Sequence, residues 1–123
     1  MNIFLSIVVG IVSFGAVPNN ESVNNADAIN SAIEQCSSRG GGVVTVPAGV
    51  FTTGTVYMKS GVTVRLERGA TLKGTACLDD YASLKTADDL SMYESGRGTV
   101  NYNSATDPQW SKAMIMAVGV SNA

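Results

Sequence analysis

A repeat of about 20 residues is the feature that most limits what this chain can fold into. The stretch VTVPAGVFTTGT (44–55) aligns with VRLERGATLKGT (64–75). The alignment superposes apolar, glycine and threonine positions: Val44 on Val64, Val46 on Leu66, Gly49 on Gly69, Gly54 on Gly74 and Thr55 on Thr75. Short strands and glycine turns recurring at such a period are typical of stacked repeats, in which each repeat buries its apolar face on the next. The sequence therefore predicts an all-β solenoid with coils over about residues 43–75.

One helix is predicted directly before these coils. In ADAINSAIEQC the apolar side chains fall at i, i+3, i+4 and i+7, which is one face of a helix: Ile29, Ala32, Ile33 and Cys36. We expect a helix over about residues 24–39, with Asn24 as N-cap and Asp27 completing a capping box. Such a helix would cover the open apolar end of the first coil and block edge-to-edge pairing.

Three consecutive glycines, Gly40–Gly42, raise the question of a phosphate-binding loop. In such loops the glycines precede a helix, so that the positive end of the helix dipole meets the anion. Here they follow the predicted helix, precede the strand VVTV, and are not followed by Gly-Lys-Ser/Thr. We therefore interpret them as the end of the helix, where glycine takes the left-handed conformation.

Composition excludes several classes of function. The 123 residues, about one domain, carry a net charge of −2 and contain no Lys/Arg-rich block, which argues against a nucleic-acid surface. Histidine is absent, which excludes a histidine-based triad or metal site within this sequence. We expect no metal and no cofactor. Cys36 and Cys77 lack metal-site spacing, and two small buried thiols are favoured over a disulfide.

Residues 1–10 allow two interpretations. The apolar run Ile3–Val9, with Val8 and Gly10 as small residues at a cleavage site, suits a truncated signal or leader, although no Lys or Arg precedes it. This interpretation places the folded domain at 11–123 and predicts a secreted or periplasmic protein. The alternative is a first β-strand, and the run is too short to span a bilayer.

The repeat pattern lapses over residues 76–110. About 30 residues without periodicity usually mean a functional excursion or disorder. The apolar stretch that follows predicts another strand at 113–118. This last coil would be uncapped and open to self-association.

The motifs, in this order, resemble the N-terminal region of polygalacturonase-like glycoside hydrolases (family 28) of the pectate-lyase-like superfamily. The resemblance is carried by FGAV (14–17), ADAINSAIEQC (26–36), GGGVVTVPAGVFTTGTVYMKSGVTVRLERGATLKGT (40–75) and KAMIMA (112–117). It implies a right-handed parallel β-helix and hydrolysis of galacturonide linkages in pectic polysaccharide. The family's catalytic stretches lie in later coils, so no catalytic residue is carried over and this chain alone is expected to be inactive.

The chain offers few residues of its own for chemistry. Inverting glycosidases need two carboxyl groups about 6.5–9.5 Å apart. The pairs Asp79–Asp80 and Asp88–Asp89 lie in the aperiodic region, where no rigid strand fixes their separation, so solvated loop acids are the favoured interpretation.

Substrate binding has weak candidates only. A basic strip for an acidic polysaccharide would consist of Arg65, Arg68 and Lys73, and Arg65 should point outward because it alternates with Val64 and Leu66. Aromatic side chains that would stack on sugar rings are Tyr93, Tyr102 and Trp110. An ordinary charged face and ordinary packing are the competing interpretations. Arg65, Arg68, Tyr93 and Trp110 remain the candidates.

Three hypotheses follow for function. The first is an N-terminal fragment of a pectin-degrading hydrolase whose parent binds pectic polysaccharide. The second is a non-enzymatic β-helix module for carbohydrate binding or assembly, with residues 113–118 as the mating face. The third is a lyase of the same fold, which would take its calcium carboxylates and basic residue from other coils.

Overall fold

The computed structural model describes residues 7–82 and 112–123. Their elements, in order, are β1 (Ile7–Gly10), the 3-10 helix η1 (Ile11–Phe14), α1 (Ala26–Ser38), β2 (Gly42–Val46), β3 (Gly49–Thr53), β4 (Val56–Tyr57), β5 (Val62–Leu66), β6 (Ala70–Gly74), the 3-10 helix η2 (Leu78–Asp80) and β7 (Ile115–Met116). All strand pairs are parallel and form three small sheets, β1-β2-β5, β3-β6 and β4-β7.

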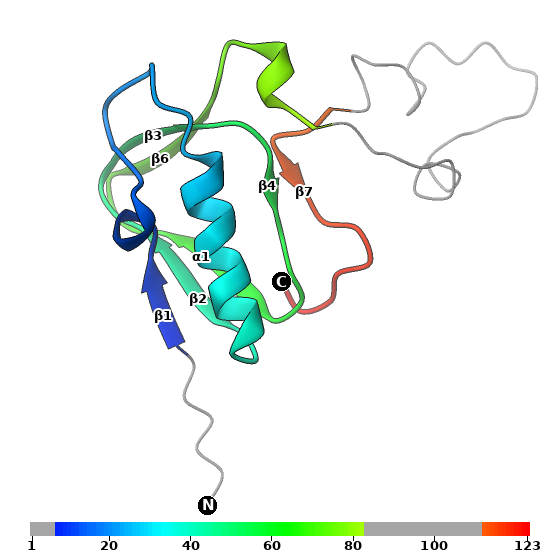
Figure 1. The fold of residues 1–123 in the computed structure, drawn as a ribbon. Helices are drawn as coiled ribbons and strands as arrows, with labels where there is room; N and C mark the ends of the chain where they lie inside the picture. The colour runs from blue at the N-terminus through cyan, green and yellow to red at the C-terminus, as the bar shows by residue number, and fades with distance from the viewer. Residues whose placement is uncertain (1–6, 83–111) are drawn as a thin grey trace, which may run out of the picture.

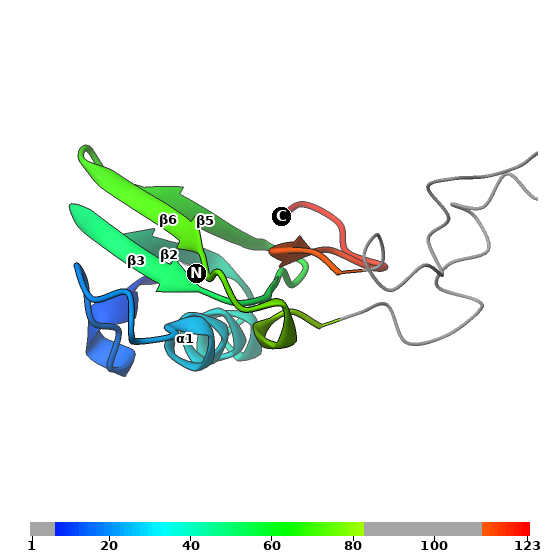
Figure 2. The same ribbon diagram turned by 90° about the horizontal axis from the view of Figure 1, so that it is seen from above.

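The three sheets surround an opening that α1 lies across, and within each sheet the paired strands lie in successive layers. In Figure 1, β3 and β6 overlap on one side, β2 lies on a second, and β4 and β7 lie on the third, with α1 in the opening between them. Figure 2 separates the layers, with β5 and β6 above β2 and β3 and with α1 below. We call β2, β3 and β4 the lower layer and β5, β6 and β7 the upper layer. The helix therefore closes one end of the stack, as the sequence predicts.

The strand register confirms the repeat and corrects part of its alignment. Val44 pairs with Val64 and Val46 with Leu66, as expected. Beyond Val46 the sequence separation between paired residues grows from 20 to 21 positions. Gly49 pairs with Ala70 and not with Gly69. The reason is the link between strands, which holds Pro47 and Ala48 in the lower layer but three residues, 67–69, in the upper layer. The alignment of Gly49 on Gly69 and of Gly54 on Gly74 is therefore wrong by one residue.

The third sheet shows where the repeat is interrupted. Ile115 of β7 pairs with Val56 of β4, a separation of 59 positions where the β3–β6 pairing spans 21. The link between β6 and β7 is therefore 38 positions longer than the link between β3 and β4. The predicted strand at 113–118 is shorter in the structure, covering Ile115–Met116.

The ends of α1 are set by different interactions. At its C-terminus, Gly40 N–H donates to Ser37 O and Gly41 N–H donates to Cys36 O, the pattern of a Schellman motif, and both glycines have positive φ. This confirms the glycines as the end of the helix. At the N-terminus the predicted capping box is wrong. The N-cap is Asn25, whose side chain makes no capping hydrogen bond, and the helix begins one residue later than an Asn24 cap implies. Asn24 still satisfies one free N–H of the first turn, because its Oδ1 accepts from Ala26 N–H at 3.0 Å.

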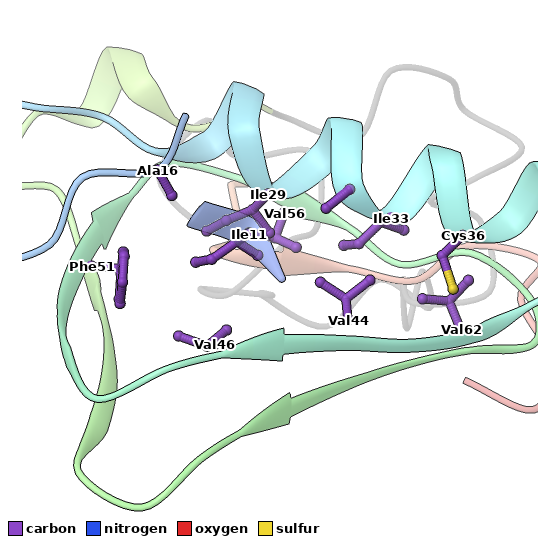
Figure 3. Packing of buried hydrophobic residues seen from close by; sticks show 11 residues of the cluster. Ile11, Ala16, Ile29, Ile33, Cys36, Val44, Val46, Phe51, Val56 and Val62 are labelled. Atoms are coloured by element: carbon purple, nitrogen blue, oxygen red, sulfur yellow. The ribbon is translucent and has the colours of Figure 1, made fainter. Parts of the chain in front are cut away.

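The core lies between α1 and the lower layer. The predicted apolar face of α1 is fully buried against valine side chains of β2, β4 and β5 and against Phe51 of β3, as Figure 3 shows. Ile11 of η1 closes the side next to β1. Burial of this kind contributes about 1.5–3 kcal/mol per large side chain, so this cluster is the main source of stability.

Four asparagines replace a strand along the lower edge of β3 and β4. Among the described residues no strand pairs with that edge. Asn19 bonds the backbone of Val50, Asn25 bonds that of Thr52, and Asn24 bonds that of Gly54. Asn30 bonds the backbone of both Thr55 and Tyr57. An edge satisfied by side chains cannot recruit another strand, and this end of the molecule is protected. We call this set the asparagine edge.

β1 lies within residues 1–10, for which the sequence allows either a leader or a first β-strand. Ile7–Gly10 forms a strand that pairs with β2, so these four residues are part of the folded unit. Residues 1–6 lie outside the described ranges, and cleavage of a leader stays a prediction. Over the ranges that the structure covers, no helix combines the length and apolar character that a bilayer crossing requires.

Candidate functional site

A buried polar cluster at the start of β4 holds together the residues that flank the 83–111 segment. Thr55 lies directly before β4 and is nearly fully buried. Its hydroxyl Oγ1 donates to Ala113 O at 2.7 Å and accepts from Ala82 N–H at 2.8 Å. One side chain therefore joins the last residue before the segment to a residue just after it. We call this cluster the neck.

Further contacts fix the neck. Lys112 Nζ donates to Leu78 O at 3.1 Å, and Thr55 N–H donates to Asp80 O. The Tyr81 hydroxyl donates to Thr75 O at 2.6 Å. Both ends of the segment are thus attached to the sheets, and the 83–111 segment starts and ends at one place on the molecule.

Two glycines make the close approach of the neck feasible. A Cβ at Gly54 would overlap the carbonyl oxygen of Asp80, and a Cβ at Gly74 would overlap the Tyr81 hydroxyl. The repeat Gly54-Thr55 and Gly74-Thr75 was visible in the sequence as a pair of turns. Their actual role in packing the neck could not be read there, because the contacting residues 80–82 and 112–113 show no periodicity.

The three predicted cations do not form one strip. Arg65 is exposed on β5, and Arg68 is exposed in the link between β5 and β6. Lys73 lies on β6, in a different sheet, and its Nζ is bonded to the carboxylate of Glu21. The hydrogen bond and charge of Lys73 lower the pKa of Glu21 below its ordinary value. Arg65 points outward as expected, and Lys73 belongs to an ion pair with the loop before α1.

Some of the predicted acidic and aromatic residues lie within the described ranges, and the others lie outside them. Asp79 is exposed and Asp80 half-buried in η2, where the backbone of Asp80, not its carboxylate, takes part in the neck. Five predicted residues lie outside the described ranges: Asp88, Asp89, Tyr93, Tyr102 and Trp110. Their roles stay predictions.

The cysteines correct one expectation. Both are free thiols, with Cys36 buried in α1 and Cys77 exposed before η2, so the prediction of two buried thiols is wrong for Cys77. Burial raises the pKa of the Cys36 thiol, which keeps it in the unreactive protonated form. In residues 7–82 and 112–123, no three His, Cys, Asp or Glu side chains are grouped to hold a metal ion.

Comparison with known proteins places this architecture beside glycoside hydrolases that act on polygalacturonate. No family model matches the chain. The exo-poly-α-D-galacturonosidase of Dickeya chrysanthemi is 40% identical over 74 residues, which are 60% of this chain and 12% of that protein. The matched part of this chain therefore spans about an eighth of the length of that curated relative.

Solved structures give the same result. The family 28 exopolygalacturonase of Yersinia enterocolitica matches with a TM-score of 0.59 and 34% identity, over 64% of this chain and 13% of that enzyme. The hyperthermoactive exopolygalacturonase of Thermotoga maritima matches with a TM-score of 0.56 and 27% identity, over 64% of this chain and 18% of that enzyme. The resemblance to polygalacturonases read from the motifs is confirmed, and it concerns a small part of those enzymes.

Proposed function

We propose that this chain is the N-terminal part of a pectin-degrading, polygalacturonase-like glycoside hydrolase, and that its parent cleaves galacturonide linkages. The observation that carries the proposal is the 40% identity to an exo-poly-α-D-galacturonosidase, together with the match to two exopolygalacturonase structures. In this proposal the described residues are the capped end of the enzyme and the neck positions a loop.

We propose that the layers are the first coils of a right-handed parallel β-helix. The parallel pairing of β2 with β5 and of β3 with β6, at separations of 20 and 21 positions, supports a regular coil. Crossover connections between parallel strands are right-handed in nearly all proteins, which supports the handedness. The asparagine edge and α1 would then form the N-terminal cap that such a stack requires.

The chemistry of the parent is acid–base hydrolysis with water as nucleophile, which needs two carboxyl groups held rigidly apart. The described acids do not supply such a pair on a strand, because Asp79 and Asp80 are neighbours in η2. We therefore expect the 123-residue chain to release no reducing ends from polygalacturonate above a buffer blank. Release at a rate that scales with chain concentration and survives repurification would contradict this.

A second experiment tests the parent directly. Sequencing the source gene beyond the codon for Ala123 is expected to show an open frame that continues the 20-residue strand pattern and encodes paired carboxylates. A stop codon at once would contradict the hydrolase proposal for this gene and favour the binding or assembly module.

Substrate contact is proposed for Arg65 and Arg68, with Tyr93 and Trp110 as stacking residues. The exposure of both arginines supports the first part, since a guanidinium can bind a carboxylate of a galacturonide with two parallel hydrogen bonds. Calorimetry with oligogalacturonate should show weaker binding for Arg65→Ala and Arg68→Ala than for Lys59→Ala, an exposed cation outside the proposed contact. Equal heats for all variants would contradict these roles.

Secretion or export to the periplasm is proposed from the apolar start of the chain and from the size of a polymeric substrate, which does not cross membranes. Fractionation of the source cells would place the protein outside the cytoplasm if the proposal holds. Recovery of the intact chain, including Met1, from the cytoplasm alone would contradict it.

A further inference from the structure

The outer face of the β3-β6 sheet carries a buried threonine hydroxyl without a partner. Phe51 and Leu72 are paired in register and pack in the core, so the next pair along the sheet, Thr52 and Lys73, points outward. Thr52 is nevertheless only 4% exposed, and among the described residues its Oγ1 makes no hydrogen bond. Because buried polar atoms are nearly always hydrogen-bonded in folded proteins, this hydroxyl calls for an explanation.

An ion pair crosses the sheet at the same level. Glu21 belongs to the loop before α1, and this loop runs along the lower edge of β3, where Asn25 bonds the backbone of Thr52. Figure 2 shows the loop, in blue, below β3 on the same side as α1, with β6 above. The carboxylate of Glu21 reaches Lys73 Nζ on β6, which is the register partner of Thr52. The ion pair therefore spans the outer side of β3 at the level of Thr52.

This cluster contains one more donor than its resident acceptor uses. Lys73 Nζ and the Thr52 hydroxyl are both donors, and within the described residues the Glu21 carboxylate bonds only the lysine. The Glu21 side chain is 75% exposed and that of Lys73 is 52% exposed. Exposed ion pairs contribute little to stability, so a competing carboxylate can displace Glu21 at small cost. Because the asparagine edge holds the loop backbone, only the Glu21 side chain has to turn outward.

We propose that Thr52 and Lys73 form a binding subsite for a carboxylate of an oligogalacturonide, and that Glu21 occupies this subsite until the ligand displaces it. The proposal rests on the proposed function, because a galacturonide chain carries a carboxylate on each sugar. The ammonium supplies a charge-assisted hydrogen bond and the hydroxyl a second donor, so a carboxylate that is not tethered to the loop can use both. The subsite is separate from Arg65, which lies in the β1-β2-β5 sheet.

Removing the internal competitor tests the proposal. Calorimetry with trigalacturonate is expected to show roughly threefold tighter binding to Glu21→Gln than to the wild-type chain, the factor expected when an exposed ion pair no longer competes. Asp27→Asn, the same charge change at an exposed residue of α1, should change the affinity much less. Adding Lys73→Met to Glu21→Gln should abolish the gain, and adding Thr52→Val, which keeps the side-chain shape, should reduce it. The methyl-esterified trimer, which has no free carboxylate, should show no gain.

Amide chemical shifts locate the bound ligand. In Glu21→Gln, trigalacturonate should shift the amide signals of Thr52 and Lys73, and circular dichroism of each variant confirms that it is folded. The proposal would be overturned by the absence of binding to any variant or by a gain no larger than that of Asp27→Asn. A gain that survives Lys73→Met or Thr52→Val, or shifts confined to the surroundings of Arg65, would also overturn it. The gene sequence beyond Ala123 decides the parent hydrolase without reference to these variants, so the two proposals fail separately.

Discussion

Replacing Asn25 by alanine tests the asparagine edge most directly. Asn25 is 2% exposed, and its side chain makes three hydrogen bonds: Oδ1 accepts from Val17 N–H, and Nδ2 donates to Val17 O and to Thr52 O. The variant Asn25→Ala removes all three. Thr52 O keeps the backbone N–H of residue 25 as a donor, at 2.9 Å, so it is not left without a partner.

The expected cost follows from these contacts. A hydrogen bond contributes about 0.5–1.5 kcal/mol net, and a buried group that loses its partner costs more. The bond to Thr52 O is buried, whereas Val17 is 41% exposed and water can replace part of what it loses. We therefore expect Asn25→Ala to lower the free energy of unfolding by about 2–3 kcal/mol, a large share of the ordinary total.

Urea denaturation followed by circular dichroism measures this loss. The matched control is Asn20→Ala. Asn20 is exposed and its side chain bonds the nearby Ser22 N–H, so its loss should change stability by less than about 0.5 kcal/mol. If Asn25→Ala does not fold, slow amide exchange of Val17 in the wild-type chain tests the same bond. A loss under about 1 kcal/mol for Asn25→Ala, or no greater than that of the control, would refute the reasoning.

Three further perturbations probe other parts of the molecule. Thr55→Val keeps the shape of the side chain but removes both bonds of the neck, so it should cost about 1–3 kcal/mol and speed amide exchange at Ala82; unchanged exchange would speak against the neck. Gly74→Ala should destabilise by about 1–3 kcal/mol through its overlap with the Tyr81 hydroxyl, and adding Tyr81→Phe should recover part of the loss; strictly additive costs in urea would disprove the contact. The folded-state pKa of Glu21 is lowered by its lysine partner, so its contribution to stability is complete above the unfolded pKa, near 4.5, and is lost as pH falls through the lower folded value. The stability difference between wild type and Glu21→Gln should therefore shrink on acidification below that range, and a difference that grows would contradict the ion pair.

The sequence by itself determined the elements whose signals are local. The helical spacing from Ile29 to Cys36 predicted both α1 and the face that it buries, because a helix repeats every 3.6 residues along its own chain. The recurrence of apolar, glycine and threonine positions in two successive stretches predicted the pairing of Val44 with Val64. Gly40 and Gly41 marked the end of the helix, since few other residues adopt the left-handed conformation.

Only the tertiary structure decided the contacts between residues far apart in the chain. Thr55 and Ala113 are 58 positions apart, and Asn25 and Thr52 are 27 apart, so no periodicity connects them. The one-residue shift at Gly49 depended on the length of the link between β5 and β6. The exposure of Cys77 depended on its place beside η2. Hydrogen bonds of polar side chains to distant backbone depend on which segments meet once the chain is folded, and the repeat that predicts the stacking of the strands does not record those meetings.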